Sequence, residues 1–423
     1  MTQRRRIYPW VVFGLAFALL LSDYMSRQVL SAVFPLLKGE WQLSDSRLAA
    51  LNSVVALMVG LLTFPLSLLA DRWGRVKSLV LMAVIWSVAT LLCAVAMNYG
   101  QMLGARFLVG VGEAAYGSVG IAVVLSVFSP RLRASLSGAF MAGGSFGSVI
   151  GVALGGVIAV NFGWRWSFAV MAIFGFVLAL LFGAFVSQRR VNRHQIDDGG
   201  AAVGAPETGY RAPLSSLFRI ASVNLAYVGS ALNLFVAAVL LAWLPSFLNR
   251  YYGMAPDRAG AVAAIFVLLI GAGMVGCGII TDRVSRAAQT RKWTTAIVYG
   301  LIAMVALGLG FALDPGTPQL LLIGLGAFFS AGASGPVTAM VANLTHPSIR
   351  ATGFGSLTLV NSLLGLALGP VVVGVLADRI GLLGALRVTP LIYLGAIVAL
   401  LVGRRCYPAA VRRLAELTGR PPA

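Results

Sequence analysis

The sequence contains little charge, little cysteine and little histidine. Of its 423 residues, 11% are charged and 59% are hydrophobic, whereas a soluble domain carries about 25% charge. So few charges cannot cover a water-facing surface, which argues against a soluble enzyme and against a disordered chain. The apolar stretches run to about twenty residues, which fits helices that cross a bilayer and not the shorter strands of a membrane barrel.

Three cysteines and two histidines leave little material for a metal or haem centre. Cys93 and Cys277 lie in apolar segments and Cys406 lies near the C-terminus, with no metal-binding spacing between them. The sequence also lacks a nucleophile elbow and a phosphate-binding loop. We therefore expect no enzyme activity, no cofactor and no bound metal. Without a phosphate-binding loop for ATP, an ion gradient is the remaining energy source for any active transport.

Hydropathy predicts twelve membrane-spanning helices. The first follows a short basic N-terminus and is too long for a signal peptide, so we expect it to be retained. The apolar segments lie at about 8–36, 47–70, 78–97, 101–128, 134–160, 166–187, 220–248, 258–281, 293–312, 318–342, 350–377 and 384–403.

These segments form two sets of six. We expect an N-terminal six-helix bundle (1–187), a cytoplasmic linker rich in Arg, Gly, Ala and Pro (188–219), a C-terminal six-helix bundle (220–403) and a cytoplasmic tail (404–423). The predicted fold is an all-α membrane protein whose two pseudo-repeats surround a central cavity.

The net charge is +19, and such a basic balance often indicates nucleic-acid binding. Here 23 of the 32 Lys and Arg residues fall in alternate loops and the termini, and seven fall in the opposite loops. This bias follows the positive-inside rule and predicts that both termini and the linker are cytoplasmic. It gives no reason to expect a nucleic-acid partner.

The two halves repeat each other. The second apolar segment ends in Asp71-Arg72 and the eighth ends in Asp282-Arg283. The fifth and eleventh open alike, with Arg133-Ala-Ser and Arg350-Ala-Thr. A duplicated six-helix unit is an arrangement of transporters.

Four ionisable residues of the Lys, Arg, Asp and Glu types lie well inside the predicted spans, all in the first half: Asp23, Arg27, Arg106 and Glu113. Charge at this depth is costly unless it is paired or hydrated. We predict that Arg27 and Arg106 bind a substrate anion through forked hydrogen bonds, and that Glu113 and Asp23 exchange protons. A purely structural salt-bridge cluster is the alternative interpretation.

The second half offers neutral polar groups. We predict that Asn233, Ser334 and Asn361 contact substrate, and that Tyr116, one turn from Glu113, lines the same cavity. Contacts between helices are the alternative explanation, above all for a single Ser.

The stretch Ser67-Leu-Leu-Ala-Asp71-Arg72-Trp73-Gly74-Arg75 resembles the G-x-x-x-D-R-x-G-R signature of the major facilitator superfamily, with Ser67 where Gly is usual. Arg106-x-x-x-Gly110-x-Gly112 resembles a second signature of that family. The resemblance covers the whole chain. We predict a conformational gate at Asp71, Arg72 and Arg75, repeated at Asp282 and Arg283. Asp71 would meet either the N-terminal dipole of the next helix or an arginine such as Arg131 or Arg133. Orientation by positive charge alone is the alternative interpretation.

Within the family, residues 12–168 are most similar to the bacterial spinster-like branch, and the anion:cation symporter branch is second. Both branches usually place Asp immediately before the first-helix Arg, where this chain has Ser26. The acid has either moved one turn, to Asp23, or left coupling to Glu113 alone.

The resemblance implies a transporter in the bacterial inner membrane that moves an organic or amphipathic anion by alternating access with proton coupling. A spinster-type exporter of lysolipids and an uncoupled facilitator are the alternatives. We expect a monomer whose partners are a small-molecule or lipid-like anion, protons and membrane lipids.

Overall fold

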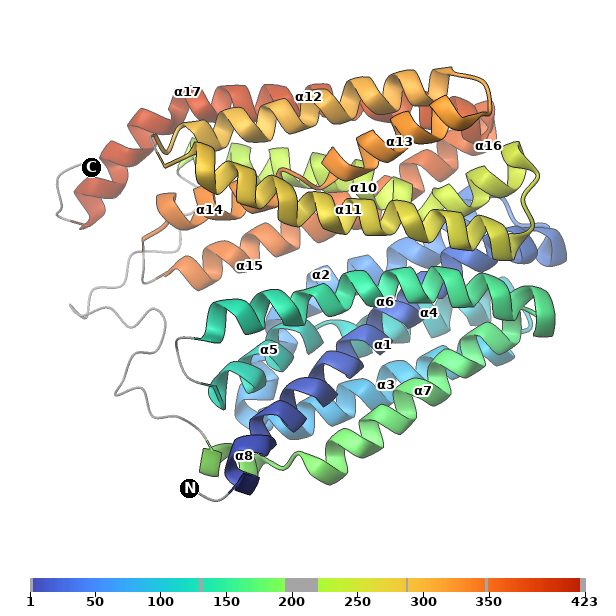
Figure 1. The fold of residues 1–423 in the computed structure, drawn as a ribbon, viewed down its shortest axis with the longest axis horizontal. Coiled ribbons are helices and arrows are strands. Elements are labelled where there is room, and N and C mark those ends of the chain that lie inside the picture. Colours follow the sequence, from blue (N-terminus) through green and yellow to red (C-terminus); the bar gives the residue numbers. More distant parts are fainter. Residues whose placement is uncertain (1–2, 129–131, 195–219, 287, 347–348, 419–423) are drawn as a thin grey trace. The chain divides into compact units, whose positions relative to one another are not determined.

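The computed structural model describes residues 3–128, 132–194, 220–286, 288–346 and 349–418 (Figure 1), and within them it contains helices and no strand. The helices of the first part of the chain are α1 (Gln3–Trp41), α2 (Asp45–Trp73), α3 (Arg75–Val95), α4 (Tyr99–Glu113), α5 (Tyr116–Ser126), α6 (Arg133–Phe162), α7 (Trp164–Phe185) and α8 (Gln188–His194).

The second part continues with more helices and two short helical turns of other types. They are α10 (Ala221–Tyr252), α11 (Pro256–Val284), α12 (Arg291–Ala312), α13 (Thr317–Ser330), α14 (Ser334–Leu344), α15 (Arg350–Val360), the π-helix η3 (Asn361–Ala367), α16 (Leu368–Val388), the 3-10 helix η4 (Thr389–Leu391) and α17 (Ile392–Thr418).

Local sequence explains several helix ends. Ser44 caps α2, because its Oγ accepts the Arg47 N–H at 3.3 Å, and Asn98 caps α4 by accepting the Gln101 N–H at 2.9 Å. Between α2 and α3, Gly74 has φ 104°, a conformation that side chains disfavour. The glycine of the D-R-x-G-R signature thus makes the turn that separates these helices.

Eleven helices among the described residues are long and apolar enough to cross a membrane. The last, Thr352–Arg413, has 62 residues, about three times the length that one crossing needs. The backbone leaves helical geometry inside it at Gly381, where φ is 76°. Counting the segments on either side separately gives the twelve spans predicted from the sequence.

Two predicted spans are interrupted. The span expected at 101–128 is divided between α4 and α5, which are separated by Ala114 and Ala115. The span expected at 318–342 is divided between α13 and α14, which are separated by residues 331–333. The fourth and tenth predicted spans hold the same place in each pseudo-repeat, so both repeats have a helix broken within its apolar length.

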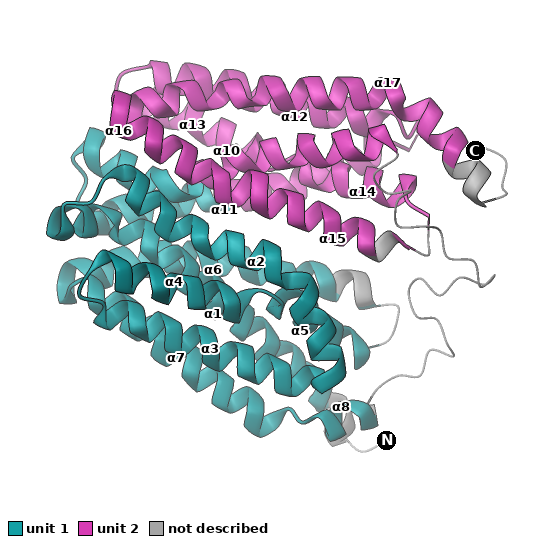
Figure 2. Cartoon of the chain, turned by 180° about the vertical axis from the view of Figure 1, so that it is seen from behind, with its two compact units in different colours: residues 1–198, 241–268 teal, residues 199–240, 269–423 magenta. Residues whose placement is uncertain are grey.

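The chain forms two compact units (Figure 2). Unit 1 comprises Met1–Asp198 and Leu241–Leu268, and unit 2 comprises Gly199–Leu240 and Leu269–Ala423. Most of the expected linker, residues 195–219, lies outside the described residues, and residues 188–194 form α8.

In unit 1, α1 packs closely on α6 through glycines. A Cβ added at Gly147 would lie 2.4 Å from the Leu21 carbonyl oxygen, and one at Gly151 would lie 2.7 Å from that of Met25. Only glycine permits this approach. The contact fixes the part of α1 that carries Asp23 and Arg27.

Candidate functional site

The centre of the site is an ion pair between α1 and α4 in unit 1. Arg27 Nη2 lies 2.8 Å from Glu113 Oε2, and Arg27 Nε donates to the same oxygen at 3.1 Å. The Glu113 side chain is fully buried, and 16% of the Arg27 side chain is exposed. Sequence analysis selected both residues, and the structure brings them into direct contact.

Two other α1 residues complete the polar cluster. Asp23 Oδ1 lies 3.6 Å from Arg27 Nη2, one helical turn away, and has no hydrogen-bond partner among the described residues. Ser26 Oγ lies 3.2 Å from Glu113 Oε1 and 2.8 Å from the Asp23 carbonyl oxygen. Its single proton serves one of these acceptors at a time. Ser26 can therefore donate either to Glu113 or to the Asp23 carbonyl oxygen.

Arg106 lies in a different environment from Arg27. Its side chain is fully buried, and it donates to the carbonyl oxygens of Leu51 (3.2 Å), Ser26 (3.2 Å) and Arg27 (3.3 Å). These contacts join α4 to α1 and α2 beside the ion pair. Of the two arginines predicted to bind substrate, Arg27 is the one that meets carboxylates and has exposed surface.

Tyr116 belongs to the hydrophobic core of unit 1. It is fully buried, its hydroxyl donates to the Ala16 carbonyl oxygen at 2.9 Å, and its ring meets Trp86 edge to face at 5.0 Å. Tyr116 begins α5, across the break that follows Glu113, and its hydroxyl is already paired with the α1 backbone.

The expected gate residues of the first half lie at the end of α2. Arg75 Nε donates to Asp71 Oδ1 at 2.8 Å across the Gly74 turn, with side chains 43% and 54% exposed, and Arg72 is also exposed. The alternative partners expected for Asp71, the side chains of Arg131 and Arg133, lie outside the described part of the chain.

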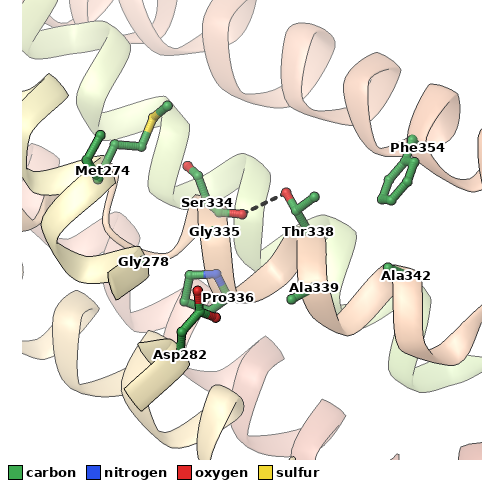
Figure 3. Close-up of a pocket in the computed structure, with 11 residues that line it drawn as sticks. Met274, Gly278, Asp282, Ser334, Gly335, Pro336, Thr338, Ala339, Ala342 and Phe354 are labelled. Carbon is green, nitrogen blue, oxygen red and sulfur yellow. Dashed lines mark hydrogen bonds between the residues drawn. The ribbon is translucent and has the colours of Figure 1, made fainter. Parts of the chain in front are cut away.

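Unit 2 contains a cavity of about 470 Å³ between α11, α14 and α15 (Figure 3). Asp282 lines it from α11, Ser334 and Thr338 line it from α14, and Phe354 lines it from α15. Thr338 Oγ1 donates to the Ser334 carbonyl oxygen at 2.8 Å, while the Ser334 hydroxyl is buried without a partner among the described residues. The structure thus places a predicted gate residue, Asp282, and a predicted binding residue, Ser334, on one cavity. Arg283, the residue after Asp282, is exposed.

Two asparagines of unit 2 have unused acceptors. Asn233 is buried on α10 and donates from Nδ2 to the Gly229 carbonyl oxygen at 2.7 Å. Asn361 begins the π-helix η3. Within the described residues, neither side-chain oxygen has a hydrogen-bond donor. A buried amide with a spare acceptor is a group that a hydroxylated ligand or a water molecule satisfies.

The chemistry available in unit 1 is exchange of anions on one guanidinium. Two N–H groups of Arg27 converge on one oxygen of Glu113, and a ligand carboxylate can accept from the same donors. No group of three or more His, Cys, Asp or Glu side chains among the described residues is arranged to hold a metal ion. Sequence reasoning missed the hydrogen bond from Ser26 to Glu113, although the unusual residue beside Arg27 was a signal for it.

Comparison with known proteins agrees with these observations. The family model described as Major Facilitator Superfamily matches residues 16–370 and 227–421. The chain is 24% identical over 373 residues to the hexuronate transporter of Bacillus subtilis (strain 168), covering 85% of this chain and 86% of that protein. It is 27% identical over 393 residues to a probable L-galactonate transporter of Escherichia coli (strain K12), covering 89% and 84%.

A solved structure has the same fold. The crystal structure of a bacterial homologue of the human lysosomal transporter spinster, in an inward-facing and unoccupied conformation, superposes with a TM-score of 0.82 at 19% identity. The match covers 95% of this chain and 98% of that one. The all-helical transporter fold predicted from the sequence is confirmed.

Proposed function

The chain belongs to the Major Facilitator Superfamily, and from this premise we propose that it is a proton-coupled secondary transporter of an organic anion. It is a multi-pass integral membrane protein and a transporter, not an enzyme. The observation that carries the proposal is the buried ion pair between Arg27 and Glu113. The positive charge bias supports placement in a bacterial inner membrane with both termini cytoplasmic.

Coupling is a competition for Arg27. When Glu113 is ionised, its carboxylate occupies the guanidinium of Arg27. Protonation removes the charge on Glu113, the pair weakens, and the forked donors of Arg27 accept a substrate carboxylate. Alternating access then carries substrate and proton across together. Ser26 follows the exchange by turning its hydroxyl between Glu113 and the Asp23 carbonyl oxygen.

Arg106 and Asp23 support this exchange. Arg106 uses its donors on three backbone carbonyl oxygens, so its part is to hold α1 at the depth where Arg27 meets Glu113. Asp23 keeps a carboxylate near Arg27 while Glu113 is protonated, which limits the time that the guanidinium spends unpaired. Tyr116 orients α1 through its hydrogen bond to Ala16.

The substrate that the relatives favour is a hydroxylated carboxylate. One relative is a hexuronate transporter and another is a probable L-galactonate transporter. Each of these two proteins matches more than four fifths of this chain. The spare polar groups of Asn233, Ser334 and Asn361 are suited to substrate hydroxyl groups. A thermal-shift screen against sugar acids, other organic acids and lysolipids identifies the substrate, and a response to lysolipids alone would favour the spinster-type alternative.

The test of coupling is Glu113→Gln in proteoliposomes, with the best ligand from that screen. The glutamine cannot release a proton, so accumulation driven by a pH gradient is expected to vanish. Counterflow exchange requires no net proton movement and should persist. If the variant still concentrates substrate under a pH gradient, the proton travels by another group and the proposal fails. Wild-type protein that only equilibrates its substrate would identify an uncoupled facilitator.

A further inference from the structure

The helix break beside Glu113 is joined to a neighbouring helix. α4 ends at Glu113 and α5 begins at Tyr116, and between them Ala115 has φ −112° and ψ 1°. Thr63 Oγ1 on α2 donates to the carbonyl oxygen of Ala114, within this break, at 2.7 Å. The backbone immediately after Glu113 is therefore held by a side chain from α2.

Near Thr63, α2 itself lacks one of its backbone hydrogen bonds. Pro65 lies inside this helix, two residues after Thr63, and it has no N–H to donate to the preceding turn. Thr63 Oγ1 also lies 2.5 Å from the Val59 carbonyl oxygen of its own helix. Its one proton is shared between a local acceptor and the carbonyl oxygen at the α4–α5 break.

A second contact ties α2 to α5 on the other side of the break. Ser67 Oγ and Ser118 Oγ lie 2.8 Å apart, and one of them donates to the other across this contact. The remaining hydroxyl proton goes to a backbone carbonyl oxygen, that of Thr63 at 2.6 Å from Ser67 Oγ or that of Ala115 at 2.9 Å from Ser118 Oγ. Thr63, Ser67 and Asp71 follow at four-residue spacing, so they share a face of α2. Ser67 is the residue that replaces the usual glycine of the signature.

We propose that Thr63 is a positioning residue for Glu113, an inference that rests on the proposed proton-coupled function. Its hydrogen bond to Ala114 fixes where α4 ends, and this sets the reach of the Glu113 carboxylate toward Arg27. The hydroxyls of Thr63, Ser67 and Ser118 join the break to the helix that carries Asp71. A change of charge on Glu113 is thereby transmitted to α2 through the backbone of residues 114 and 115.

The experiment uses infrared difference spectroscopy of the purified full-length protein, which requires no substrate. The carboxyl band that disappears in Glu113→Gln belongs to Glu113, and its pH titration is followed in three further variants. Thr63→Val keeps the shape and removes the hydroxyl, while Thr63→Ser restores it. Thr90→Val is the matched control. Within the part of the chain that the structure describes, the buried Thr90 hydroxyl donates only to the carbonyl oxygen of Trp86 in its own helix, α3, at 2.7 Å.

We expect Thr63→Val to move the titration midpoint to higher pH by about half a unit or more, because a looser pair with Arg27 favours the protonated carboxyl group. Thr63→Ser and Thr90→Val should titrate as wild type does. An unchanged midpoint in Thr63→Val, or an equal shift in Thr90→Val, overturns the inference and leaves the proposed function intact. If Glu113→Gln removes no titrating band, the coupling role of Glu113 fails and the role of Thr63 fails with it.

Discussion

At the scale of single residues, the two membrane arginines of unit 1 differ in the groups to which they donate hydrogen bonds. Both were predicted to bind substrate, because a charge within an apolar span requires a function or a partner. The structure pairs Arg27 with carboxylates and Arg106 with backbone carbonyl oxygens. Acidic partners are visible in a sequence, whereas carbonyl oxygens are present at every residue. Only the folded structure could therefore distinguish the two roles.

Lysine substitutions test this difference. Arg27→Lys keeps the charge but loses the forked contact with one carboxylate, so ligand affinity should fall at least about tenfold while thermal stability changes little. Arg106→Lys loses most of its three carbonyl contacts in a fully buried position, so it should lower stability by roughly 2–5 kcal/mol. Affinity is measured by ligand titration and stability by thermal unfolding of the purified variants. Equal effects of the two substitutions on affinity would contradict the division of roles.

At the scale of helices, composition predicted the spans but not the breaks within them. Ala114 and Ala115 have the highest helix propensity of any residue type, yet they separate α4 from α5. The contacts that accompany this break, such as the hydrogen bond from Thr63, come from residues about fifty positions away. Hydropathy reports how apolar a window is, so it predicted residues 101–128 as one span and missed the interruption beside Glu113.

The ends of three helices in unit 1 meet at a buried carboxylate that the sequence analysis did not select. Asp45 opens α2, and its side chain is 4% exposed. Arg250 of α10 donates to both of its oxygens, at 2.6 and 2.8 Å, and Lys38 of α1 donates to one of them at 2.6 Å. In the sequence, Asp45 is a first-turn acid next to a cap, a position that suits the helix dipole without any partner. Arg250 is 205 residues away from Asp45 in the sequence, so this ion pair could not be predicted from the sequence.

Removing the charge of Asp45 should be costly for unit 1. Asp45→Asn leaves two cations beside a neutral amide in a buried position, so we expect a loss of about 3–5 kcal/mol in thermal unfolding. Glu40→Gln is the control, because Glu40 pairs with Arg165 near the end of α1 with side chains 41% and 44% exposed, and a glutamine still offers an oxygen to the Trp164 indole N–H that Glu40 accepts. An exposed pair of this kind contributes less than about 1 kcal/mol. Similar losses in the two variants would show that burial does not determine the contribution of these pairs.

At the scale of the whole molecule, the fold could be predicted because few backbone structures satisfy all their hydrogen bonds inside a membrane. An apolar chain with regular polar interruptions must form spanning helices, and the positive charges and repeated motifs then predict an orientation and a duplication. The distribution of internal charge is the feature on which the proposed function rests. All four deep charges lie in the first half, and in unit 1 they are two acids and two bases: Asp23, Glu113, Arg27 and Arg106.

Under the proposed mechanism, this balance predicts the charge of the substrate. The cluster is neutral when both acids are ionised, and it is neutral again when Glu113 is protonated and one substrate carboxylate sits on Arg27. A second substrate charge would find no free arginine, since Arg106 is committed to carbonyl oxygens. An uncompensated buried charge is strongly unfavourable. The charge count therefore favours a monocarboxylate that travels with one proton, without net charge movement.

Electroneutral transport can be tested by separating the two components of the proton gradient in proteoliposomes. A pH gradient at zero membrane potential should drive accumulation of the monocarboxylate, whereas a potential set with potassium and valinomycin at equal pH should drive none. Ser26→Asp supplies the comparison, because it adds a third acid beside Glu113 and Arg27. If that acid is also protonated in each cycle, an inside-negative potential should accelerate uptake by the variant. Uptake by the wild-type protein that responds to potential alone would mean that more than one proton accompanies each anion, and the charge count in unit 1 would then not describe the transport cycle.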